Sequence, residues 1–190
     1  MKGRESGMPD ESMWDTFFDA PEILAKLEFD SSVRTAIEFG SGYGTFSIPA
    51  SQIVSEQLVA LDIEAPLIET LVQHANELRF PIQAICRDFV ANGTGLANES
   101  SDYAMLFNIL HIEDPVSLLK EAARVLKDAG KVGVIHWNYD DATPRGPSMD
   151  IRPKPKDCIN WARDAGLTLV KQVDLPPYHY GLVFKKNKGK

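Results

Sequence analysis

The segment TAIEFGSGYGT, residues 35–45, decides the fold that we expect for this chain. Its first five residues favour a strand and include one acid, Glu38, and three glycines follow at positions 40, 42 and 44. Glycine accepts positive φ angles and, because it lacks a Cβ atom, lets a ligand lie against the main chain. A helix that begins after such a turn offers unpaired N–H groups to an anionic group. The segment therefore predicts a strand, a ligand-binding turn and a helix, although a tight turn without a ligand is the alternative.

The spacing of these glycines distinguishes between ligands. A dinucleotide fingerprint, G-x-G-x-x-G, would need glycine at position 45, which is Thr45. The observed pattern is E-x-G-x-G-x-G, and the next apolar run ends in an acid, Asp62. This combination resembles motif I of the class I S-adenosylmethionine-dependent methyltransferases. The resemblance implies that Glu38, Gly40 and Gly42 contact the cofactor S-adenosyl-L-methionine.

Composition limits the class of protein. The chain has 190 residues, of which 44% are apolar and 25% charged, as in one soluble globular domain. Its net charge of −7 argues against a nucleic-acid partner. Cys86 and Cys158 belong to no C-x-x-C pair, so we expect neither a disulfide framework nor a zinc site. No apolar stretch has the length of a membrane span and the N-terminus is polar, so we expect a cytoplasmic protein. Nothing in the sequence indicates an oligomeric state.

Alternating patterns along the chain predict an α/β architecture. The predicted strands are residues 35–39, 57–62, 82–87, 102–107, 131–135, 168–175 and 180–185. Helical patterns separate the first five, which favours an open, mostly parallel sheet covered on both faces. Only four residues, PPYH, join the last two strands, so these should form an antiparallel hairpin. We therefore expect a single-domain, Rossmann-like three-layer sandwich whose seven-stranded sheet ends in an antiparallel C-terminal strand, as in the methyltransferases that it resembles.

Terminal residues define two of the expected helices. Pro66 can open a helix that runs to about residue 78, because the missing N–H of proline has no partner in a first turn. Asp114 is the expected N-cap of a second helix that starts at Pro115 and has an apolar face up to Leu126. Gly130 then follows as a glycine past the end of this helix.

The N-terminal region is expected to add a helical cap. Residues 10–27 have a helical pattern in two pieces that break near residues 19–21, with Trp14, Phe17 and Phe18 on one face. We therefore divide the chain into a cap segment, residues 1–29, and a methyltransferase domain, residues 30–190. Methyltransferases of this class often close their site with such a segment, so it is either a lid or a piece packed against the sheet.

The second and third predicted strands end in acidic residues. The ionised carboxylate of Asp62 can accept two hydrogen bonds and so hold the hydroxyls of a ribose, although NAD-binding folds also use an acid there and it could cap the next helix. The third strand ends in CRDF. The resemblance implies that Asp88 accepts from the adenine amino group while Phe89 and Ile63 cover the ring. An acid in an ordinary turn after a strand is the alternative.

The fourth predicted strand and its continuation, SDYAMLFNILHIEDP, resemble motif IV of the methyltransferase type 11 branch, which includes quinone-biosynthesis enzymes. The resemblance implies that main-chain carbonyls near Asn108 meet the methionine ammonium group. His111 lies at the rim, where it could orient a substrate, take a proton or pack under the next helix. His136 is the second candidate base. The spacing of His111, Glu113, Asp114 and His136 matches no familiar ligand pattern, so we expect no metal.

Residues 136–156 form a long segment with four prolines beyond the fifth predicted strand. Loops longer than about 12 to 15 residues are usually functional or disordered. Trp137, Arg145 and Arg152 are the candidate substrate contacts, because arginine can grip a carboxylate or phosphate through two hydrogen bonds. A rigid loop without a function is the alternative.

These patterns predict an S-adenosylmethionine-dependent methyltransferase that transfers a methyl group by in-line displacement, with a small-molecule acceptor. Such a displacement mainly requires alignment and exclusion of water. An oxygen or carbon acceptor would also need a base, whereas a neutral amine would not. Two alternatives remain open: a catalytically silent adenosylmethionine-binding partner subunit and an NAD-dependent oxidoreductase.

Overall fold

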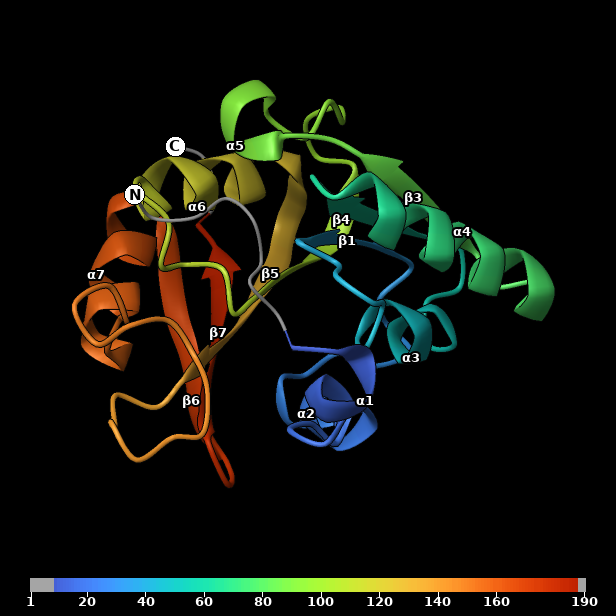
Figure 1. The fold of residues 1–190 in the computed structure, drawn as a ribbon. Helices are drawn as coiled ribbons and strands as arrows, with labels where there is room; N and C mark the ends of the chain where they lie inside the picture. The colour runs from blue at the N-terminus through green and yellow to red at the C-terminus, as the bar shows by residue number, and fades with distance from the viewer. Residues whose placement is uncertain (1–8, 188–190) are drawn as a thin grey trace.

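A computed structural model of the chain describes residues 9–187, which fold around one mixed sheet (Figure 1). The strands are β1 (Thr35–Phe39), β2 (Gln57–Asp62), β3 (Ile82–Cys86), β4 (Ser101–Phe107), β5 (Leu126–Trp137), β6 (Leu167–Leu175) and β7 (His179–Lys186). The helices are α1 (Glu11–Asp15), α2 (Ala20–Lys26), α3 (Ser47–Ser51), α4 (Ala65–Leu78), α5 (Phe89–Asn92), α6 (Pro115–Val125) and α7 (Pro155–Asp164). Residues 1–8 and 188–190, which belong to the predicted cap segment and domain, lie outside the described range.

Within this range the sheet has the strand order β3-β2-β1-β4-β5-β7-β6. The first five strands pair in parallel, and β7 is antiparallel to both β5 and β6. The predicted α/β fold, with a mostly parallel sheet and a C-terminal antiparallel hairpin, is therefore confirmed. Because β1 and β4 are neighbours although β2 and β3 come between them in sequence, the chain reverses its direction of winding at β1. Ligands of open α/β sheets bind at such a switch point, beyond the carboxyl ends of the strands.

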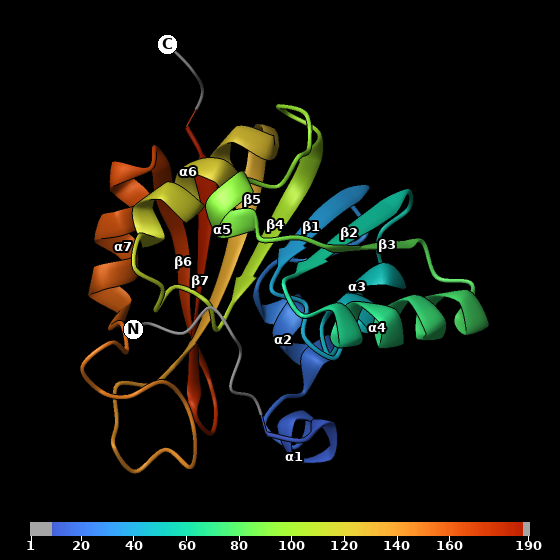
Figure 2. The same ribbon diagram turned by 45° about the horizontal axis from the view of Figure 1, so that its top comes forward.

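Helices cover both faces of the sheet (Figure 2). On β1, Ile37 packs in the core shared with α6 and α7, whereas its neighbour Ala36 packs in the core shared with α2 and α3. This alternation follows from the two-residue period of a strand, and it explains why the central strands are apolar on both faces. No helix in residues 9–187 is both long and apolar enough to cross a membrane.

The boundary between α6 and β5 corrects one prediction. Asp114 caps α6 as expected, since its carboxylate accepts from the N–H of Ser117. The helix ends at Val125, however, and Leu126 already pairs with Ser101 in the sheet. Gly130 therefore lies inside an irregular stretch of β5 and is not the first residue after a helix. The strand begins at the buried Leu126, four residues before Gly130.

The N-terminal helices are attached to the sheet by a buried hydrogen bond. The hydroxyl of Tyr103 on β4 donates to the carbonyl of Leu27, just after α2, at 2.7 Å. Gly133 on β5 leaves room for this hydroxyl, because a Cβ atom there would lie 2.3 Å from the Tyr103 oxygen. The two predicted helical pieces are present, and Asp19 caps the second by accepting from the Glu22 N–H. The segment that follows α2 is therefore fixed against β4 before the chain enters β1.

Candidate functional site

The turn after β1 holds its three glycines in the left-handed region, with φ of +78° at Gly40, +53° at Gly42 and +89° at Gly44. The N–H groups of Gly40 and Ser41 both donate to the carbonyl of Leu61 on β2. A Cβ atom at Gly40 would lie 3.0 Å from the side chain of Ile109. The turn therefore brings β1, β2 and the end of β4 closer together than any larger residue allows.

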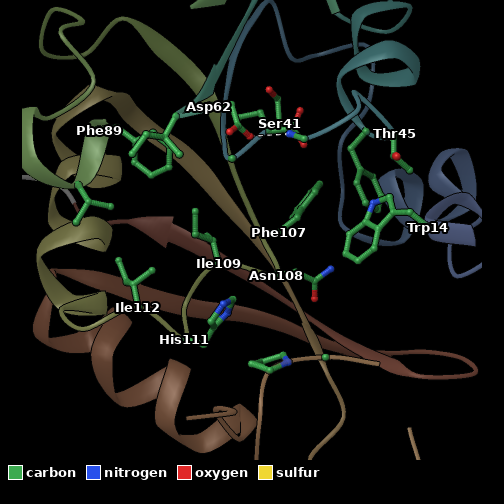
Figure 3. A pocket seen from close by; sticks show the side chains of 18 of the residues that line it. Trp14, Ser41, Thr45, Asp62, Phe89, Phe107, Asn108, Ile109, His111 and Ile112 are labelled. Atoms are coloured by element: carbon green, nitrogen blue, oxygen red, sulfur yellow. Dashed lines mark hydrogen bonds between the residues drawn. The ribbon is translucent and has the colours of Figure 1, made fainter. Parts of the chain in front are cut away.

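This turn borders a cavity of about 390 Å³ at the carboxyl ends of the parallel strands (Figure 3). The cavity is within the range of small-molecule sites, about 300–1,000 Å³. Its lining includes all eight predicted cofactor contacts: Glu38, Gly40, Gly42, Asp62, Ile63, Asp88, Phe89 and Asn108. Of the other predicted site residues, His111, Trp137 and Arg145 also line it. His136 and Arg152 do not belong to the lining.

Asp62 is a buried acceptor at the end of β2. One carboxylate oxygen accepts from the Gly42 N–H at 2.8 Å and the other from the Glu64 N–H at 3.0 Å. Burial raises the pKa of this carboxyl group. Each carboxylate oxygen can accept a second hydrogen bond, so one ribose hydroxyl can be held at each. The N-cap residue of helix α4 is Glu64, so Asp62 does not cap this helix as the alternative suggested. Asp62 instead accepts from the Gly42 N–H and stabilises the glycine turn.

Glu38 is almost completely buried, and its carboxyl group receives a hydrogen bond from the hydroxyl of Ser47 on α3. Burial raises the pKa of Glu38 to about 8, and the nearby charge of Asp62 acts in the same direction. At neutral pH the side chain therefore carries a proton. A cation placed in the cavity would favour the ionised form, because opposite charges attract strongly where water is excluded.

An apolar region with one acid lies at the end of β3. Phe89 is buried, and its ring packs edge-on against Phe39 with centroids 5.5 Å apart. Asp88 caps the short helix α5 by accepting from the Ala91 N–H at 2.9 Å. With Ile63, these side chains give the cavity lining apolar groups next to a carboxylate, which suits a heteroaromatic ring with an amino group.

Asn108, just beyond β4, has an unsatisfied amide. Its main chain adopts φ of +54°, and its N–H donates to the carbonyl of Ile135. Both polar atoms of the side chain are buried without a hydrogen-bond partner among the described residues, as is the hydroxyl of Ser41. A buried polar group without a partner costs about 1–3 kcal/mol, so these groups indicate a place for a polar ligand. Sequence reasoning expected main-chain carbonyls near Asn108 and missed the amide.

The two candidate histidines contact each other. Nδ1 of His111 lies 3.3 Å from Nε2 of His136. His136 is fully buried behind the lining, and burial, with the neighbouring His111 charge, keeps its pKa well below the usual value. His136, which was a candidate base or substrate-orienting residue, lies outside the cavity lining, and its ring contacts the lining residue His111 instead. Among residues 9–187, no three His, Cys, Asp or Glu side chains are grouped to hold a metal.

Arg152 fastens the proline-rich loop between β5 and α7. Its guanidinium donates to the carbonyls of Asn138, Asp140, Arg145 and Pro147 at 2.8–3.3 Å. It is only 8% exposed and lies outside the cavity lining. The grip on an anion predicted for Arg152 is therefore corrected, because its donors already hold the loop. Arg145 remains as the lining arginine of this loop.

Replacing Arg152 by methionine is expected to loosen this loop and to lower the free energy of unfolding by about 2–4 kcal/mol, because several carbonyls lose their donor. Cleavage by chymotrypsin at the exposed Tyr139 should become faster, as limited proteolysis would measure. The control is Arg145→Met, which removes an arginine from the same loop but leaves the hydrogen bonds from Arg152 to the four carbonyls in place. Equal cleavage of the two variants would contradict the assignment.

Helix α1 closes one side of the cavity. Trp14 lines it, and the centroid of the Trp14 ring lies 6.5 Å from that of Trp137, another lining residue. The hydroxyl of Thr45, in the glycine turn, donates to Asp15 at 2.9 Å, and that of Tyr43 donates to the carbonyl of Pro9. These contacts place α1 over the glycine turn. Whether it opens as a lid stays a prediction.

Comparisons with known proteins agree with this geometry. The family described as "Methyltransferase domain" matches residues 36–130, half of the chain. An uncharacterized methyltransferase-like protein of Schizosaccharomyces pombe is 28% identical over 108 residues, which are 57% of this chain and 40% of that protein. The match thus spans less than half of the length of this relative.

Solved structures resemble most of the chain. The structure of a SAM-dependent methyltransferase from Aquifex aeolicus has a TM-score of 0.81 and 19% identity, and the match covers 93% of both chains. The cyclase SpnF has a TM-score of 0.77 and 15% identity, with 97% of this chain and 85% of that chain covered. At identities this low the likeness shows the fold alone, and the names of the two neighbours state different chemistries.

Proposed function

This chain belongs to the family of methyltransferase domains, and we propose that it is an S-adenosylmethionine-dependent methyltransferase whose acceptor is a small molecule. The observation that carries the proposal is the cavity beside the glycine turn. It combines a buried ribose acceptor, Asp62, with a protonated Glu38 and the unsatisfied amide of Asn108. A pyrophosphate would bring negative charge next to the carboxylate of Asp62, whereas a sulfonium and an ammonium group bring positive charge, which also favours ionisation of Glu38.

The lining residues fit the proposed cofactor part by part. Asp62 would hold the ribose, and the surface at Asp88 and Phe89 would hold the adenine. The methionine part would then extend along Gly40 toward Asn108, past the buried Glu38. When bound, S-adenosylmethionine supplies a methyl group on a cationic sulfur, which takes the carbon–sulfur electron pair as a lone pair of the acceptor bonds to the methyl carbon.

The residues of the chain contribute alignment and exclusion of water. Trp14 from α1, Trp137 from β5 and Ile151 of the proline-rich loop are apolar residues of the cavity lining. A cavity lined by α1 and this loop suits an acceptor that fits inside it. The net charge of −7 argues against nucleic acid as the acceptor.

A thermal-shift experiment tests the proposal. S-adenosylmethionine and S-adenosylhomocysteine, each at about one hundred times its dissociation constant, should stabilise the protein by roughly 2.7 kcal/mol and raise its Tm by about 5–10 °C. NADH should leave the Tm unchanged. Release of S-adenosylhomocysteine with pooled small metabolites should then reveal turnover.

The outcomes separate three functions. Stabilisation by NADH but not by S-adenosylmethionine would favour the oxidoreductase. Stabilisation by S-adenosylmethionine without turnover on any pool, unless a second protein is added, would favour the silent partner subunit. Stabilisation together with turnover supports the methyltransferase.

A further inference from the structure

Arg145 is a lining residue whose side chain has little to bind in the ligand-free protein. Of the lining side chains outside the proposed cofactor contacts, only Arg87 and Arg145 carry a permanent charge in the described part of the chain. The guanidinium of Arg87 donates to the carbonyls of Asn92 and Gly93 at 2.9 and 2.6 Å, so it holds the turn after α5. The one hydrogen-bond acceptor of Arg145 among the described residues is the sulfur of Met13, at 3.7 Å. Sulfur is a weak acceptor, so the guanidinium has donors to offer to a stronger one.

The acid nearest in charge to this arginine, Asp10, has other partners. Its carboxylate accepts from the Ser12 hydroxyl and from the Met13 N–H. These two hydrogen bonds are the main causes that lower the pKa of Asp10, and the charge of Arg145 adds a smaller contribution. Asp10 is exposed, and water and salt weaken the attraction between exposed charges. A bound anion can therefore take the place of Asp10 at small cost.

The main chain at Arg145 is fixed, although the side chain is not. The carbonyl of Arg145 accepts from the Thr143 hydroxyl at 2.9 Å and from the Arg152 guanidinium at 3.3 Å. The next residue, Gly146, has φ of +114°, and a Cβ atom there would lie 2.8 Å from both Trp137 and Arg152. A binding group on a preorganised main chain loses less conformational freedom when a ligand binds. The loop therefore fixes the point from which the Arg145 side chain reaches the cavity.

Aromatic residues of the lining lie next to this arginine. Trp14, labelled in Figure 3, follows Met13, the residue that Arg145 contacts. The ring of Trp137 packs against Gly146, and the centroids of the two indole rings are 6.5 Å apart. Small-molecule sites usually combine apolar walls with a few polar or charged groups that fix orientation. This part of the lining therefore suits a molecule with an aromatic body and one charged group.

The charges of the cavity indicate the sign of that group. Arginine binds a carboxylate or a phosphate through two parallel hydrogen bonds. The lining acids Glu38, Asp62 and Asp88 all belong to the proposed cofactor contacts. The sulfonium of the cofactor would add a second positive charge, which also attracts an anion. An anionic acceptor would thus meet positive charge both at Arg145 and at the methyl donor.

We propose that Arg145 binds an oxyanion of the acceptor, and that the acceptor is a small aromatic molecule with a carboxylate or a phosphate group. This inference rests on the proposed function and names its class of substrate. Arg145 is then a specificity-determining residue, because it selects and orients the acceptor by the anionic group while the indole rings hold the aromatic body.

Calorimetric titration with matched pairs of probes tests the charge preference without turnover. The protein is first saturated with S-adenosylhomocysteine. Benzoate, phenylacetate and phenyl phosphate are the anionic probes, and benzamide, phenylacetamide and dimethyl phenyl phosphate are their neutral counterparts. At least one anion should bind about tenfold or more tightly than its counterpart, and the better anion shows whether a carboxylate or a phosphate is preferred. If no anion bound better than its counterpart, the inference would be wrong.

Substitution of Arg145 assigns this preference to one side chain. Arg145→Met should weaken the binding of the preferred anion by about 10- to 150-fold and leave its neutral counterpart unaffected. Arg145→Lys should restore part of the affinity, because lysine keeps the charge but not the two parallel hydrogen bonds. The control is Arg163→Met on α7, which removes an exposed arginine that does not line the cavity. An equal loss in Arg163→Met, or no loss in Arg145→Met, would contradict the assignment.

A thermal shift with S-adenosylmethionine separates this inference from the proposed function. Arg145→Met should show the full shift of the parent, because the proposed cofactor contacts are other residues. A smaller shift in this variant would place Arg145 at the cofactor and overturn its assignment to the acceptor. A missing shift in the parent would instead overturn the methyltransferase, whichever probes bind. With an acceptor that turns over, Arg145→Met should raise KM more than it lowers kcat, and an unchanged KM would contradict the inference.

Discussion

Replacing Asp62 by asparagine is expected to weaken the binding of S-adenosylmethionine by roughly 10- to 150-fold. The amide keeps the shape of the side chain but has only one acceptor oxygen and no charge, so one ribose hydroxyl and the Gly42 N–H lose their acceptor. A hydrogen bond to a charged group contributes about 1.5–3 kcal/mol, and the loss of the one to the ribose corresponds to this factor, whereas the lost bond from the Gly42 N–H lowers the stability of the turn. Calorimetric titration of the parent and variant with S-adenosylmethionine would measure it.

Asp102 offers a matched control at the opposite end of the sheet. Its carboxylate accepts from the Thr35 N–H and from the Lys127 ammonium group, so Asp102→Asn also removes a charge with structural hydrogen bonds. This variant should lose stability but bind S-adenosylmethionine with the affinity of the parent. If both variants bound equally well, Asp62 would not hold the ribose and the proposed orientation of the cofactor would be wrong.

Replacing Glu38 by glutamine is expected to make the ligand-free protein more stable than the parent at alkaline pH. The folded parent holds the Glu38 proton up to a pKa of about 8, whereas the unfolded chain releases it near 4.5. The contribution is fully present below pH 4.5 and is lost as the pH rises toward 8, by up to roughly 4–5 kcal/mol. Glutamine has no such proton, so the stability difference should grow through this window and then stay constant. Urea unfolding from about pH 5 to about pH 9 would measure it.

Glu121 on α6 provides the control, because its pKa is shifted the other way. Its hydrogen bonds with Arg124 and Thr94 lower the pKa of Glu121 to about 2, so its stabilisation is present above pH 4.5 and is lost only as the pH falls toward 2. Glu121→Gln should therefore be less stable than the parent by a constant amount over the measured range. A constant difference for Glu38→Gln as well would show that Glu38 is ionised in the folded protein.

The cofactor side of the candidate site could be predicted from the sequence because its residues follow directly from the strands. Glu38, Asp62 and Asp88 each lie at or just past the end of a strand, and the carboxyl ends of parallel strands meet at one edge. Local patterns therefore fix both the position of these acids and their proximity. The confirmed hairpin of β6 and β7 depends on an equally local feature, the short connection between the two strands.

The remainder of the site depends on packing between distant segments. Arg145 and Arg152 look alike in the sequence, and only the folded loop decides that one lines the cavity while the other is buried under carbonyls. His136 likewise lies outside the cavity lining, because side chains alternate along β5 and its neighbour Trp137 is the one that lines the cavity. Trp14 lines the cavity although it precedes β1 by about twenty residues in the sequence. The only feature of the sequence that indicated a role for Trp14 was the face that it shares with Phe17 and Phe18.

The way in which Arg152 holds the proline-rich loop has a consequence for how the acceptor specificity of this protein could be changed. All but one of its hydrogen bonds end on main-chain oxygens, and the exception is the hydroxyl of Thr143. Gly146 must also be kept, since a Cβ atom there would lie 2.8 Å from both Arg152 and Trp137. Thr143 and Asp140 must be kept as well, because the Thr143 hydroxyl accepts from Arg152 and the Asp140 carboxylate accepts from the Ala142 N–H. A combinatorial library confined to the cavity-lining Arg145, Pro147 and Ile151 would leave these contacts in place while it samples altered acceptor preferences.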